Sequence, residues 1–478
     1  MLIRQIADDK LAQYAYLIGC QQTGEAIVID PERDIDRYMA IAAGEGLRIV
    51  AVTETHIHAD FLSGARELAH AVPGLRVYLS DEGGDDWRHA WPEADGINAI
   101  RLKNGDSLQI GRIDIRAWHT PGHTPEHLTF VITDKGGGAT VPMGMVTGDF
   151  VFVNDLGRPD LLESALGIRG VMQGAARRLY TSAQGLAAFE DYLQIWPGHG
   201  AGSACGKALG AVPVTTLGYE RRTSPALLKA AAGEDDFVRY ILADQPEPPL
   251  YFAAMKRLNR DGAPVLGTIP APRRLSAEAI AAFAASAETQ LVDTRVDRQA
   301  FMQSHVPGSF YVPLNKTFTT SAGSVLDMDA PVVLLVDESR LDEAVRDLLR
   351  IGYDRISGWA PPSTIDELRQ QGTRLAGIES ISFEELERRR STASLEILDV
   401  RTAAEHASAH IPDSRQIAHT RLRDALGLVP ATSPVYVHCA AGARAAVSAA
   451  LLAHHGRRVV HVDGAFASWR PQAAAIAG

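Results

Sequence analysis

Cysteine is scarce in this chain of 478 residues. The three cysteines, Cys20, Cys205 and Cys439, lie far apart in the sequence. A sparse and odd set of this kind does not form the disulfide framework that is typical of small secreted domains. Because structural disulfides are rare in reducing compartments but common outside them, this composition favours a cytoplasmic location.

Long hydrophobic runs and basic runs are missing as well. The sequence holds no apolar stretch of the roughly 18 residues that a membrane span needs. The first nine residues lack the basic start, apolar stretch and cleavage site of a signal peptide. Lysine and arginine number 47 against 58 aspartate and glutamate residues, which gives a net charge of −11. We therefore expect neither a membrane nor a nucleic-acid partner.

The length predicts several domains, because one hydrophobic core seldom serves so long a chain. In the first half, short apolar runs bounded by glycine and proline predict strands at Ala15–Gly19, Ala26–Asp30, Ile49–Glu54, Val77–Ser80, Ile113–Trp118, Leu128–Thr133 and Met145–Phe150. A helix is predicted over Phe61–Ala71. The pattern turns helical from Val214 to Arg260, and Pro264–Pro272 is typical of a linker.

The last part of the chain contains an internal repeat. Leu291–Arg295 is echoed by Leu398–Arg401, and the stretch that begins at His305 by the one that begins at His410. The copies lie about a hundred residues apart, which is the size of one small α/β domain. Strands that alternate with helices predict a parallel sheet in each copy. We therefore predict one domain over residues 1–262, a linker over 263–274, and repeat domains over 275–372 and 376–478.

Four short segments of the first half, residues 55–61, 120–125, 147–149 and 196–200, hold residue types that bind metals. Together they contain His56, His58, Asp60, His123, Asp149 and His199. In the last three segments the His or Asp stands beside glycine, where the backbone can turn sharply and present a side chain. A single histidine is more often structural, but four such segments in one domain predict a metal site.

The order of these segments resembles the metallo-β-lactamase superfamily, whose fold is an αββα sandwich. Within it, residues 1 to about 260 are similar to persulfide dioxygenases, which are mononuclear iron enzymes. The resemblance implies one Fe(II) held by His56, His123 and Asp149, a ligand set that leaves open positions for substrate and O₂. It also implies three side chains that orient ligands or donate hydrogen bonds toward the open positions, namely His58, Asp60 and His199.

Phe61 breaks the superfamily pattern His-x-His-x-Asp-His. The histidine that is usual at this position binds a second metal, and a phenyl ring cannot replace it as a ligand. We therefore expect one metal instead of the two zinc ions of a hydrolase. His119 and His127 match no ligand position and are expected to be structural.

Two further residues near the metal-type segments are candidates for substrate binding. Arg158 follows Asp149 and could bind the carboxylate of the substrate thiol, although an ion pair within a loop would explain it equally well. Cys205 follows His199 among small residues. It could line the substrate channel and exchange persulfide sulfur, or it could serve as a small buried apolar residue.

The segment from Val437 to Arg444 carries a second kind of chemistry. Cys439 lies between an apolar strand and an Ala-rich helix, where backbone N–H groups and a helix N-terminus favour the thiolate. Arg444 provides a cation for thiosulfate or sulfite. This loop resembles that of the rhodanese sulfurtransferases, and its six residues from Cys439 to Arg444 match the length associated with sulfur transfer. Ala445 stands where the family usually has Ser or Thr.

The first repeat lacks this chemistry. Its corresponding loop runs from Asp337 to Leu341 and has no cysteine, and its two carboxylates would repel an anionic substrate. We expect residues 275–372 to form a rhodanese-like domain that is not catalytic.

Together, the two resemblances imply oxidation of a persulfide to sulfite at Fe(II), followed by transfer of sulfane sulfur from Cys439 to sulfite, which yields thiosulfate. The thiol carrier, glutathione, coenzyme A or another thiol, stays open, and a dimer or tetramer is expected. One alternative is a thioester hydrolase of the glyoxalase II type. Another is a sulfur-carrier module without oxygenase activity.

Overall fold

The computed structural model describes residues 1–164, 167, 170–284, 286 and 288–470. The last eight residues of the predicted segment 376–478 thus lie outside the described residues. The chain divides into two compact units. The first comprises Met1–Ile269 and Leu349–Gly352, and the second comprises Pro270–Leu348 and Tyr353–Gly478.

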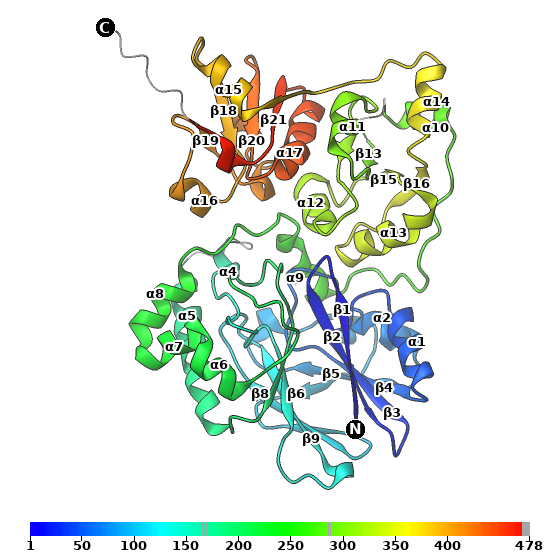
Figure 1. Ribbon diagram of the computed structural model, residues 1–478. Coiled ribbons are helices and arrows are strands. Elements are labelled where there is room, and N and C mark those ends of the chain that lie inside the picture. Colours follow the sequence, from blue (N-terminus) through cyan, green and yellow to red (C-terminus); the bar gives the residue numbers. More distant parts are fainter. Residues whose placement is uncertain (165–166, 168–169, 285, 287, 471–478) are drawn as a thin grey trace. The chain divides into compact units, whose positions relative to one another are not determined.

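Two six-stranded sheets form the centre of the first unit (Figure 1). The strands of the first sheet are β1 (Leu2–Asp8), β2 (Gln13–Cys20), β3 (Glu25–Ile29), β4 (Arg48–Thr53), β5 (Arg76–Ser80) and β6 (Ile100–Leu102). Those of the second are β7 (Ser107–Ile110), β8 (Ile113–His119), β9 (Leu128–Asp134), β10 (Gly144–Gly148), β11 (Gln194–Pro197) and β12 (Thr215–Thr216).

Each sheet follows the chain order from one edge to the other. The first has the order β1-β2-β3-β4-β5-β6 and runs antiparallel up to β3 and parallel from β3 onward. The second has the order β12-β11-β10-β9-β8-β7, and in it β10 and β11 form the parallel pair. The parallel pair brings the loops that follow β10 and β11 to the same edge of the sheet.

The helices of the first unit lie outside these sheets. They are α1 (Asp36–Gly44), α2 (Ala65–Ala71), α3 (Trp91–Ala94), α4 (Leu161–Ser164), α5 (Met172–Gly185), α6 (Leu217–Thr223), α7 (Pro225–Ala232), α8 (Glu234–Leu242) and α9 (Phe252–Asp261).

Three buried clusters hold the layers together. The cluster between the sheets contains Ile27 of the first sheet and Phe130 of the second. On the outer face of the first sheet, Val52 packs in one cluster with Leu68 of α2. Leu179 of α5 belongs to the cluster on the outer face of the second sheet. Apolar side chains thus point to both faces of each sheet, which confirms the predicted αββα sandwich.

The seven predicted strands are confirmed apart from their ends, but the predicted helix over Phe61–Ala71 is wrong in its first turn. The helix begins at Ala65. The side-chain amide of Asn259 donates to the carbonyl of Phe61 and its oxygen accepts from the N–H of Ser63. These long-range bonds hold residues 61–63 in an irregular turn that no local pattern encodes.

The second unit contains two parallel sheets. The four-stranded sheet has the order β14-β13-β15-β16 and the five-stranded sheet the order β17-β21-β20-β18-β19. The strands are β13 (Gln290–Asp293), β14 (Phe310–Tyr311), β15 (Val332–Leu335), β16 (Ile356–Ala360), β17 (Glu379–Ser382), β18 (Glu396–Asp399), β19 (Arg415–Gln416), β20 (Val435–His438) and β21 (Val459–Asp463). The helices are α10 (Ala277–Ala284), α11 (Arg298–Gln303), α12 (Phe318–Val325), α13 (Leu341–Arg350), α14 (Thr364–Gln370), α15 (Phe383–Arg390), α16 (Ala403–Ser408) and α17 (Ala443–His454).

The internal repeat corresponds to a buried Asp–Arg pair that occurs at the end of one strand in each sheet of the second unit. At the end of β13, Arg295 forms a bidentate pair with Asp293, with Nη2 2.7 Å from Oδ2. At the end of β18, Arg401 pairs in the same way with Asp399, at 2.5 Å. Both aspartates are completely buried. The Asp-x-Arg signature therefore fixes the turn after a central strand.

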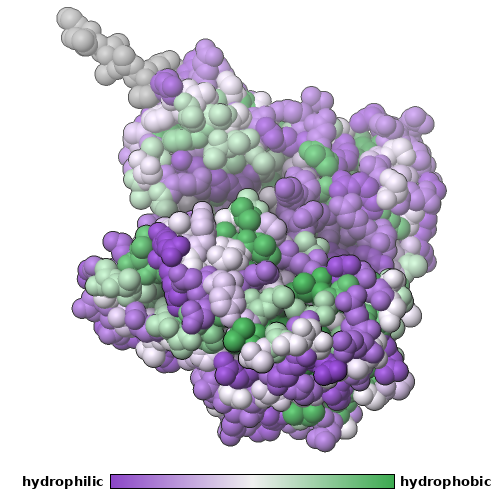
Figure 2. All heavy atoms as spheres, turned by 60° about the horizontal axis from the view of Figure 1, so that its bottom comes forward, coloured by the Kyte–Doolittle hydropathy of each residue, from purple (hydrophilic) through white to green (hydrophobic). Residues whose placement is uncertain are grey.

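The surface view in Figure 2 is mostly hydrophilic, and its hydrophobic residues form small separate patches. Within the described part of the chain, no helix combines the length and the apolar character that crossing a bilayer requires.

Candidate metal centre and cysteine loop

Loops that follow three strands carry the predicted ligands. His56 follows β4, His123 follows β8 and Asp149 follows β10 directly. Gly148, the last residue of β10, has a φ of +47°, and a Cβ atom there would lie 2.4 Å from Oγ1 of Thr55. Only glycine permits this close approach, and it brings Asp149 next to the loop of His56.

The three side chains converge on one point. Nε2 of His123 lies 3.4 Å and Nε2 of His56 3.9 Å from Oδ2 of Asp149. Metal–ligand bonds of about 2.1 Å imply ligand separations of roughly 3–3.5 Å, so one ion fits among these atoms after a small adjustment. All three residues are buried. Within the described residues, neither carboxylate oxygen of Asp149 nor Nε2 of His56 has a hydrogen-bond partner, which is costly unless a cation binds them.

Hydrogen bonds fix which nitrogen of each imidazole faces that point. The hydroxyl of Thr55 donates to Oδ2 of Asp30 and can therefore only accept from Nδ1 of His56, 2.9 Å away. Nδ1 of His123 donates to the carbonyl oxygen of Arg158 at 3.0 Å. In both rings Nδ1 thus carries the proton, and the lone pair of Nε2 is free to bind a metal.

The electrostatics of the site agree with this assignment. Burial lowers the pKa of His56 well below its ordinary value and that of His123 to about 4. Both rings are therefore neutral near pH 7, which is the ligand form. Burial raises the pKa of Asp149 to about 6. A bound cation would favour its charged form, so two imidazoles and one carboxylate fit a non-haem iron ion.

A second group of ligand-type atoms adjoins the first. Nε2 of His199 lies 3.3 Å from Oδ2 of Asp60 and 3.3 Å from Oδ1 of Asp149. Nδ1 of His199 is 3.1 Å from the carbonyl of Ala12, so Nε2 is again the free nitrogen. Cys205 belongs to the same group, in which the ligand atoms of Asp60, His199 and Cys205 all lie within 4.8 Å of one another. Asp149 thus stands between the two groups.

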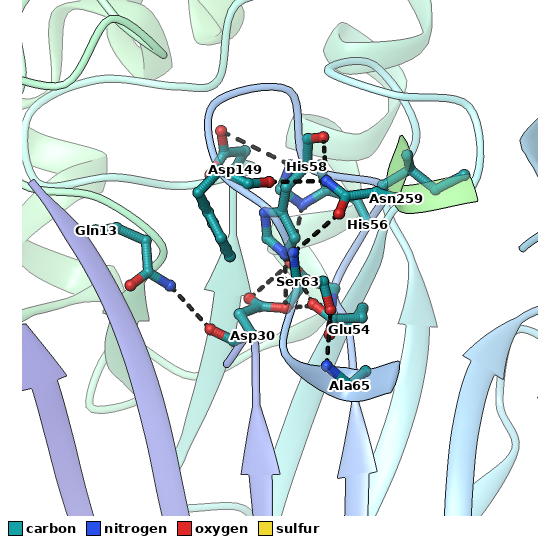
Figure 3. A network of polar contacts seen from close by, with 12 residues as sticks. Gln13, Asp30, Glu54, His56, His58, Ser63, Ala65, Asp149 and Asn259 are labelled. Atoms are coloured by element: carbon teal, nitrogen blue, oxygen red, sulfur yellow. Dashed lines mark hydrogen bonds and ion pairs between the residues drawn. The ribbon is translucent and has the colours of Figure 1, made fainter. Parts of the chain in front are cut away.

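His58 lies beside the metal ligands but is held by two carboxylates. Its Nε2 is 3.2 Å from Oδ1 of Asp30 and 3.0 Å from Oε2 of Glu54 (Figure 3). Burial alone would lower the pKa of His58, but these carboxylates outweigh it and raise the pKa well above its ordinary value. The ring of Phe61 packs against that of His58 with 4.3 Å between centroids. His58 is therefore a buried cation that anchors the loop of His56.

Several side chains that hold the loop of His56 were not predicted from the sequence. Asp30, Glu54 and Asn259 carry no motif. The one local signal is that Asp30 ends a predicted strand. His127 was expected to be structural; its Nε2 accepts the backbone N–H of Asp149 at 3.1 Å, so its contribution is to position a predicted ligand.

The two candidates for substrate binding are both buried. The guanidinium of Arg158 pairs with Asp160 through Nε and Nη2 and donates from Nη1 to the carbonyls of Ala204 and Pro246. This placement favours the ion pair that the sequence had left as an alternative. Cys205 is fully buried, and burial, with the carboxylates of Asp60 and Asp149, raises the pKa of its thiol well above the ordinary value. Such a thiol is a poor nucleophile.

The cysteine loop of the second unit connects β20 to α17. Cys439 follows β20 directly and is buried, and Gly442 precedes α17 with a φ of +86°. The first N–H groups of α17 have no partner within the helix and point toward the loop. The thiol therefore lies where an anionic sulfur group would meet the positive end of a helix.

Arg444 is held in place by α16. Its Nη1 and Nη2 each lie 2.7 Å from a carboxylate oxygen of Glu405, and its side chain also contacts Cys439. Burial tends to raise the pKa of Glu405, but the bonds from Arg444 and from the N–H of Thr402 lower it to about 2. The predicted anion-binding cation is thus partly neutralised by a carboxylate, and its charge alone does not define an anion site.

Asp463 supports the same loop from β21. A Cβ atom on Gly442 would lie 2.0 Å from Oδ1 of Asp463, so only glycine fits there. Asp463 in turn accepts hydrogen bonds from Nε of Arg298, at 3.0 Å, and from Nε2 of Gln299, at 2.6 Å. Both donors belong to α11, which comes from the repeat without a cysteine.

In that first repeat the chain after β15 turns at Asp337 into a short 3₁₀ helix, Glu338–Arg340, and Arg340 pairs with Glu343. The carboxylates of this segment stand where the second repeat has its cysteine loop, as the sequence predicts.

Two family models match the chain. Residues 8–199 match the metallo-beta-lactamase superfamily and residues 382–472 match the rhodanese-like domain. A crystal structure of a metallo-beta-lactamase from Staphylococcus aureus subsp. aureus COL is 37% identical, with a TM-score of 0.66, and the match covers 76% of this chain and 99% of that one. The chain belongs to the metallo-β-lactamase superfamily and carries a rhodanese-like domain near its C-terminus.

Persulfide dioxygenases are among its homologues. The persulfide dioxygenase ETHE1, mitochondrial, of Bos taurus is 29% identical over 231 residues, which are 48% of this chain and 76% of that protein. A cytoplasmic hydroxyacylglutathione hydrolase of Arabidopsis thaliana is 31% identical over 188 residues, which are 39% of this chain and 63% of that protein. The architecture is thus a superfamily domain with persulfide dioxygenase homologues, fused to a rhodanese-like domain.

Proposed function

We propose that this chain oxidises low-molecular-weight persulfides with O₂ at a single Fe(II) and transfers sulfane sulfur through Cys439 to the sulfite that forms. The convergence of His56, His123 and Asp149, with their ligand atoms free and their imidazoles neutral, carries the proposal. The persulfide dioxygenase among the relatives supports it.

The first reaction balances as R-S-SH + O₂ + H₂O → R-SH + SO₃²⁻ + 2 H⁺. The outer sulfur leaves its sulfur partner and gains oxygen, and the four electrons that sulfur loses reduce O₂. Bound by the triad, Fe(II) supplies a redox-active centre with open positions for both reactants. The protein itself holds each imidazole in the ligand tautomer through Thr55 and the carbonyl of Arg158. The burial of the triad keeps bulk water away from the reacting atoms.

The second reaction takes place at Cys439. Its thiolate attacks the outer sulfur of another persulfide, R-SH leaves, and Cys439 becomes a persulfide. Sulfite then attacks that outer sulfur, thiosulfate departs and the Cys439 thiolate is restored. No oxidant is needed, because the sulfane sulfur only passes from the persulfide to Cys439 and from Cys439 to sulfite. The N-terminal N–H groups of α17 stabilise the anionic sulfur in each state.

The product distribution tests this division of labour. Replacing Cys439 with Ser should leave O₂ uptake with a persulfide substrate largely unchanged, while the product shifts from thiosulfate to sulfite. Cys20, a buried thiol in β2, offers a matched control in Cys20→Ser, which should change neither product. Equal thiosulfate output from the Cys439→Ser protein would contradict the relay, and iron-loaded protein that consumes no O₂ would contradict the oxygenase.

A hydroxyacylglutathione hydrolase also occurs among the relatives, so thioester hydrolysis is the second candidate. Turnover of a glutathione thioester without O₂ uptake would favour it. A sulfur carrier without oxygenase activity would be indicated if metal-free protein transferred sulfur at the full rate and consumed no O₂.

Four further statements belong to the same proposal. The carrier thiol is glutathione, coenzyme A or another small thiol; the location is cytoplasmic; and the protein acts as a dimer or tetramer. The domain limits are those predicted, residues 1–262, 275–372 and 376–478, with the middle domain rhodanese-like and not catalytic. The four-stranded parallel sheet and the shared Asp-x-Arg pair support that last assignment.

A further inference from the structure

The carbonyl of Gly442, in the cysteine loop, receives a hydrogen bond from a buried histidine. Nε2 of His461, in β21, lies 3.0 Å from this oxygen. The same oxygen accepts the N–H of Ala446, in the first turn of α17, at 2.9 Å. His461 is completely buried, so water does not compete for its bond. The loop thus has a side-chain donor on a carbonyl that the helix already uses.

The tautomer of His461 follows from its two contacts. A carbonyl oxygen can only accept, so Nε2 carries the proton. Burial lowers the pKa of His461 below its ordinary value, so the ring is neutral near pH 7 and Nδ1 has no proton. The hydroxyl of Ser380, 2.9 Å away, therefore donates to Nδ1. Because Ser380 and His461 are paired positions of the parallel strands β17 and β21, the register of the sheet fixes this tautomer.

A second carbonyl of the cysteine loop is held from the same side. The N–H of Phe466, which follows β21, donates to the carbonyl oxygen of Ala440 at 2.8 Å. The carbonyls of Ala440 and Gly442 are thus both bonded to β21 or to the segment after it. In a trans peptide the N–H points opposite to the C=O. The N–H groups of Ala441 and Ala443 therefore point away from β21, toward the inner side of the loop.

The cysteine loop has few other groups that could stabilise an anionic sulfur. Arg444 pairs with Glu405 through both terminal nitrogens, and Ala445 has no hydroxyl group. Apart from Arg444, the residues from Ala440 to Ala445 have no polar side chain. Backbone N–H groups therefore supply most of the stabilisation, and the direction in which they point decides how much they contribute.

We propose that His461 is a positioning residue for sulfur transfer, because its Nε2–H polarises the Gly442–Ala443 peptide and orients the N–H of Ala443 toward the sulfur of Cys439. Hydrogen bonds in a chain strengthen one another where water is excluded, so a donor at the carbonyl makes the N–H of the same peptide a stronger donor. The chain runs from the hydroxyl of Ser380 through the imidazole to the first N–H of α17. The role of His461 rests on the proposed sulfur transfer, but the stabilised thiolate can be measured without it.

Alkylation of Cys439 by iodoacetamide in the full chain at pH 7 tests the proposal, because the thiolate is the form that reacts. Mass spectrometry of the peptide that contains Cys439 separates it from the other two cysteines. His461→Phe keeps a ring and removes the donor. We expect alkylation to slow about two- to fivefold, which is the effect of a helix terminus on a neighbouring charge. His455→Phe, at an exposed histidine of the same repeat, should leave the rate unchanged.

A glutamine at the same position distinguishes positioning from packing. His461→Gln keeps an N–H donor and should restore most of the rate. A loop that has merely loosened exposes its sulfur and is alkylated faster, so slower alkylation is specific for the lost donor. An unchanged or faster rate in His461→Phe, or a slow rate that His461→Gln does not restore, overturns the proposal.

Ser380→Ala takes the place of His461→Phe if the latter does not fold. Without the hydroxyl the tautomer of His461 is no longer fixed, and alkylation of Cys439 should be slower than in His455→Phe; an equal rate overturns the proposal. Failure of the proposed function gives a different result. In that case the unmodified protein forms no thiosulfate from a persulfide and sulfite, whereas the order of the alkylation rates stays as expected.

Discussion

At the scale of single residues, the metal centre depends on which ring nitrogen carries a proton. Thr55 can only accept from His56 because its own hydroxyl proton is committed to Asp30. The side chain of Thr55 thus links the carboxylate of Asp30 to the imidazole of His56 and fixes the tautomer of that ring. Groups of this kind are nearly as important for metal affinity as the ligands themselves.

Replacing Thr55 with Ala should lower the affinity for iron about 10–100-fold, because the tautomer and the ring orientation of His56 are no longer fixed. Thr55→Ser keeps the hydroxyl and should retain most of the affinity. Competition with a coloured chelator measures both. Affinity in Thr55→Ala equal to that of the unmodified protein would show that the hydrogen bond does not matter.

Single residues also show which parts of the candidate site could be predicted from the sequence and which could not. The glycine-flanked His123, Asp149 and His199 are visible because a sharp turn needs glycine next to the functional residue. The proximity of Cys205 to Asp60 could not be predicted from the sequence, because it results from two loops that meet only in the folded chain. The pairing of Arg444 with Glu405 was missed for the same reason.

At the scale of elements, α9 stabilises the loop that follows β4. Asn259 donates to the carbonyls of His58 and Phe61 and accepts from the N–H of Ser63. The loop has no regular structure of its own, so these bonds satisfy backbone groups that no helix or strand satisfies. This explains why the predicted helix began too early, since a local pattern cannot register a contact that comes from α9.

Asn259→Ala should lower the free energy of unfolding by about 3 kcal/mol, because two buried backbone groups and a partly buried one lose their partners. Arg257→Ala, on the exposed face of the same helix, should have little effect. Urea denaturation of both variants measures the difference. If Asn259→Ala lowers the free energy of unfolding no more than Arg257→Ala does, the hydrogen bonds of Asn259 do not stabilise the loop.

The pair between α16 and α17 has a defined pH dependence. The pKa of Glu405 is lowered to about 2, so the pair contributes stability above the ordinary carboxylate pKa of about 4.5 and loses it as pH falls toward 2. Glu405→Gln should therefore be less stable than the unmodified chain at pH 7, and the difference should shrink below about pH 4.5. Thermal unfolding across that range checks the sign; a constant difference would contradict it.

At the scale of the whole molecule, the candidate metal centre and the cysteine loop lie in different compact units. The alternation of strands and helices was sufficient to predict the parallel sheets of the repeats, because it follows from periodicity in the sequence. The sandwich was expected only from the resemblance to the metallo-β-lactamase superfamily. The residues of the candidate metal centre all lie within the first unit.

Removal of the metal should therefore affect the two units differently. Ligand at about a hundred times its dissociation constant contributes about 2.7 kcal/mol. For a domain of this size, that corresponds to a melting temperature about 5–10 °C higher. We expect chelation to lower the melting transition of the first unit by this amount and to leave that of the second unchanged. Calorimetry with and without a chelator measures both transitions. An equal shift of the two melting temperatures, or no shift of either, would contradict this expectation.

The support of Asp463 by α11 bears on how the chain can be divided. A fragment that begins at residue 376 would contain Cys439, Gly442 and Arg444 and would look complete as a sulfurtransferase. It would nevertheless have lost Arg298 and Gln299, the side chains that hold Asp463 against the loop. The repeat that has no cysteine thus supplies side chains that support its neighbour's cysteine loop, and the pair of repeats is the smallest fragment that keeps these contacts.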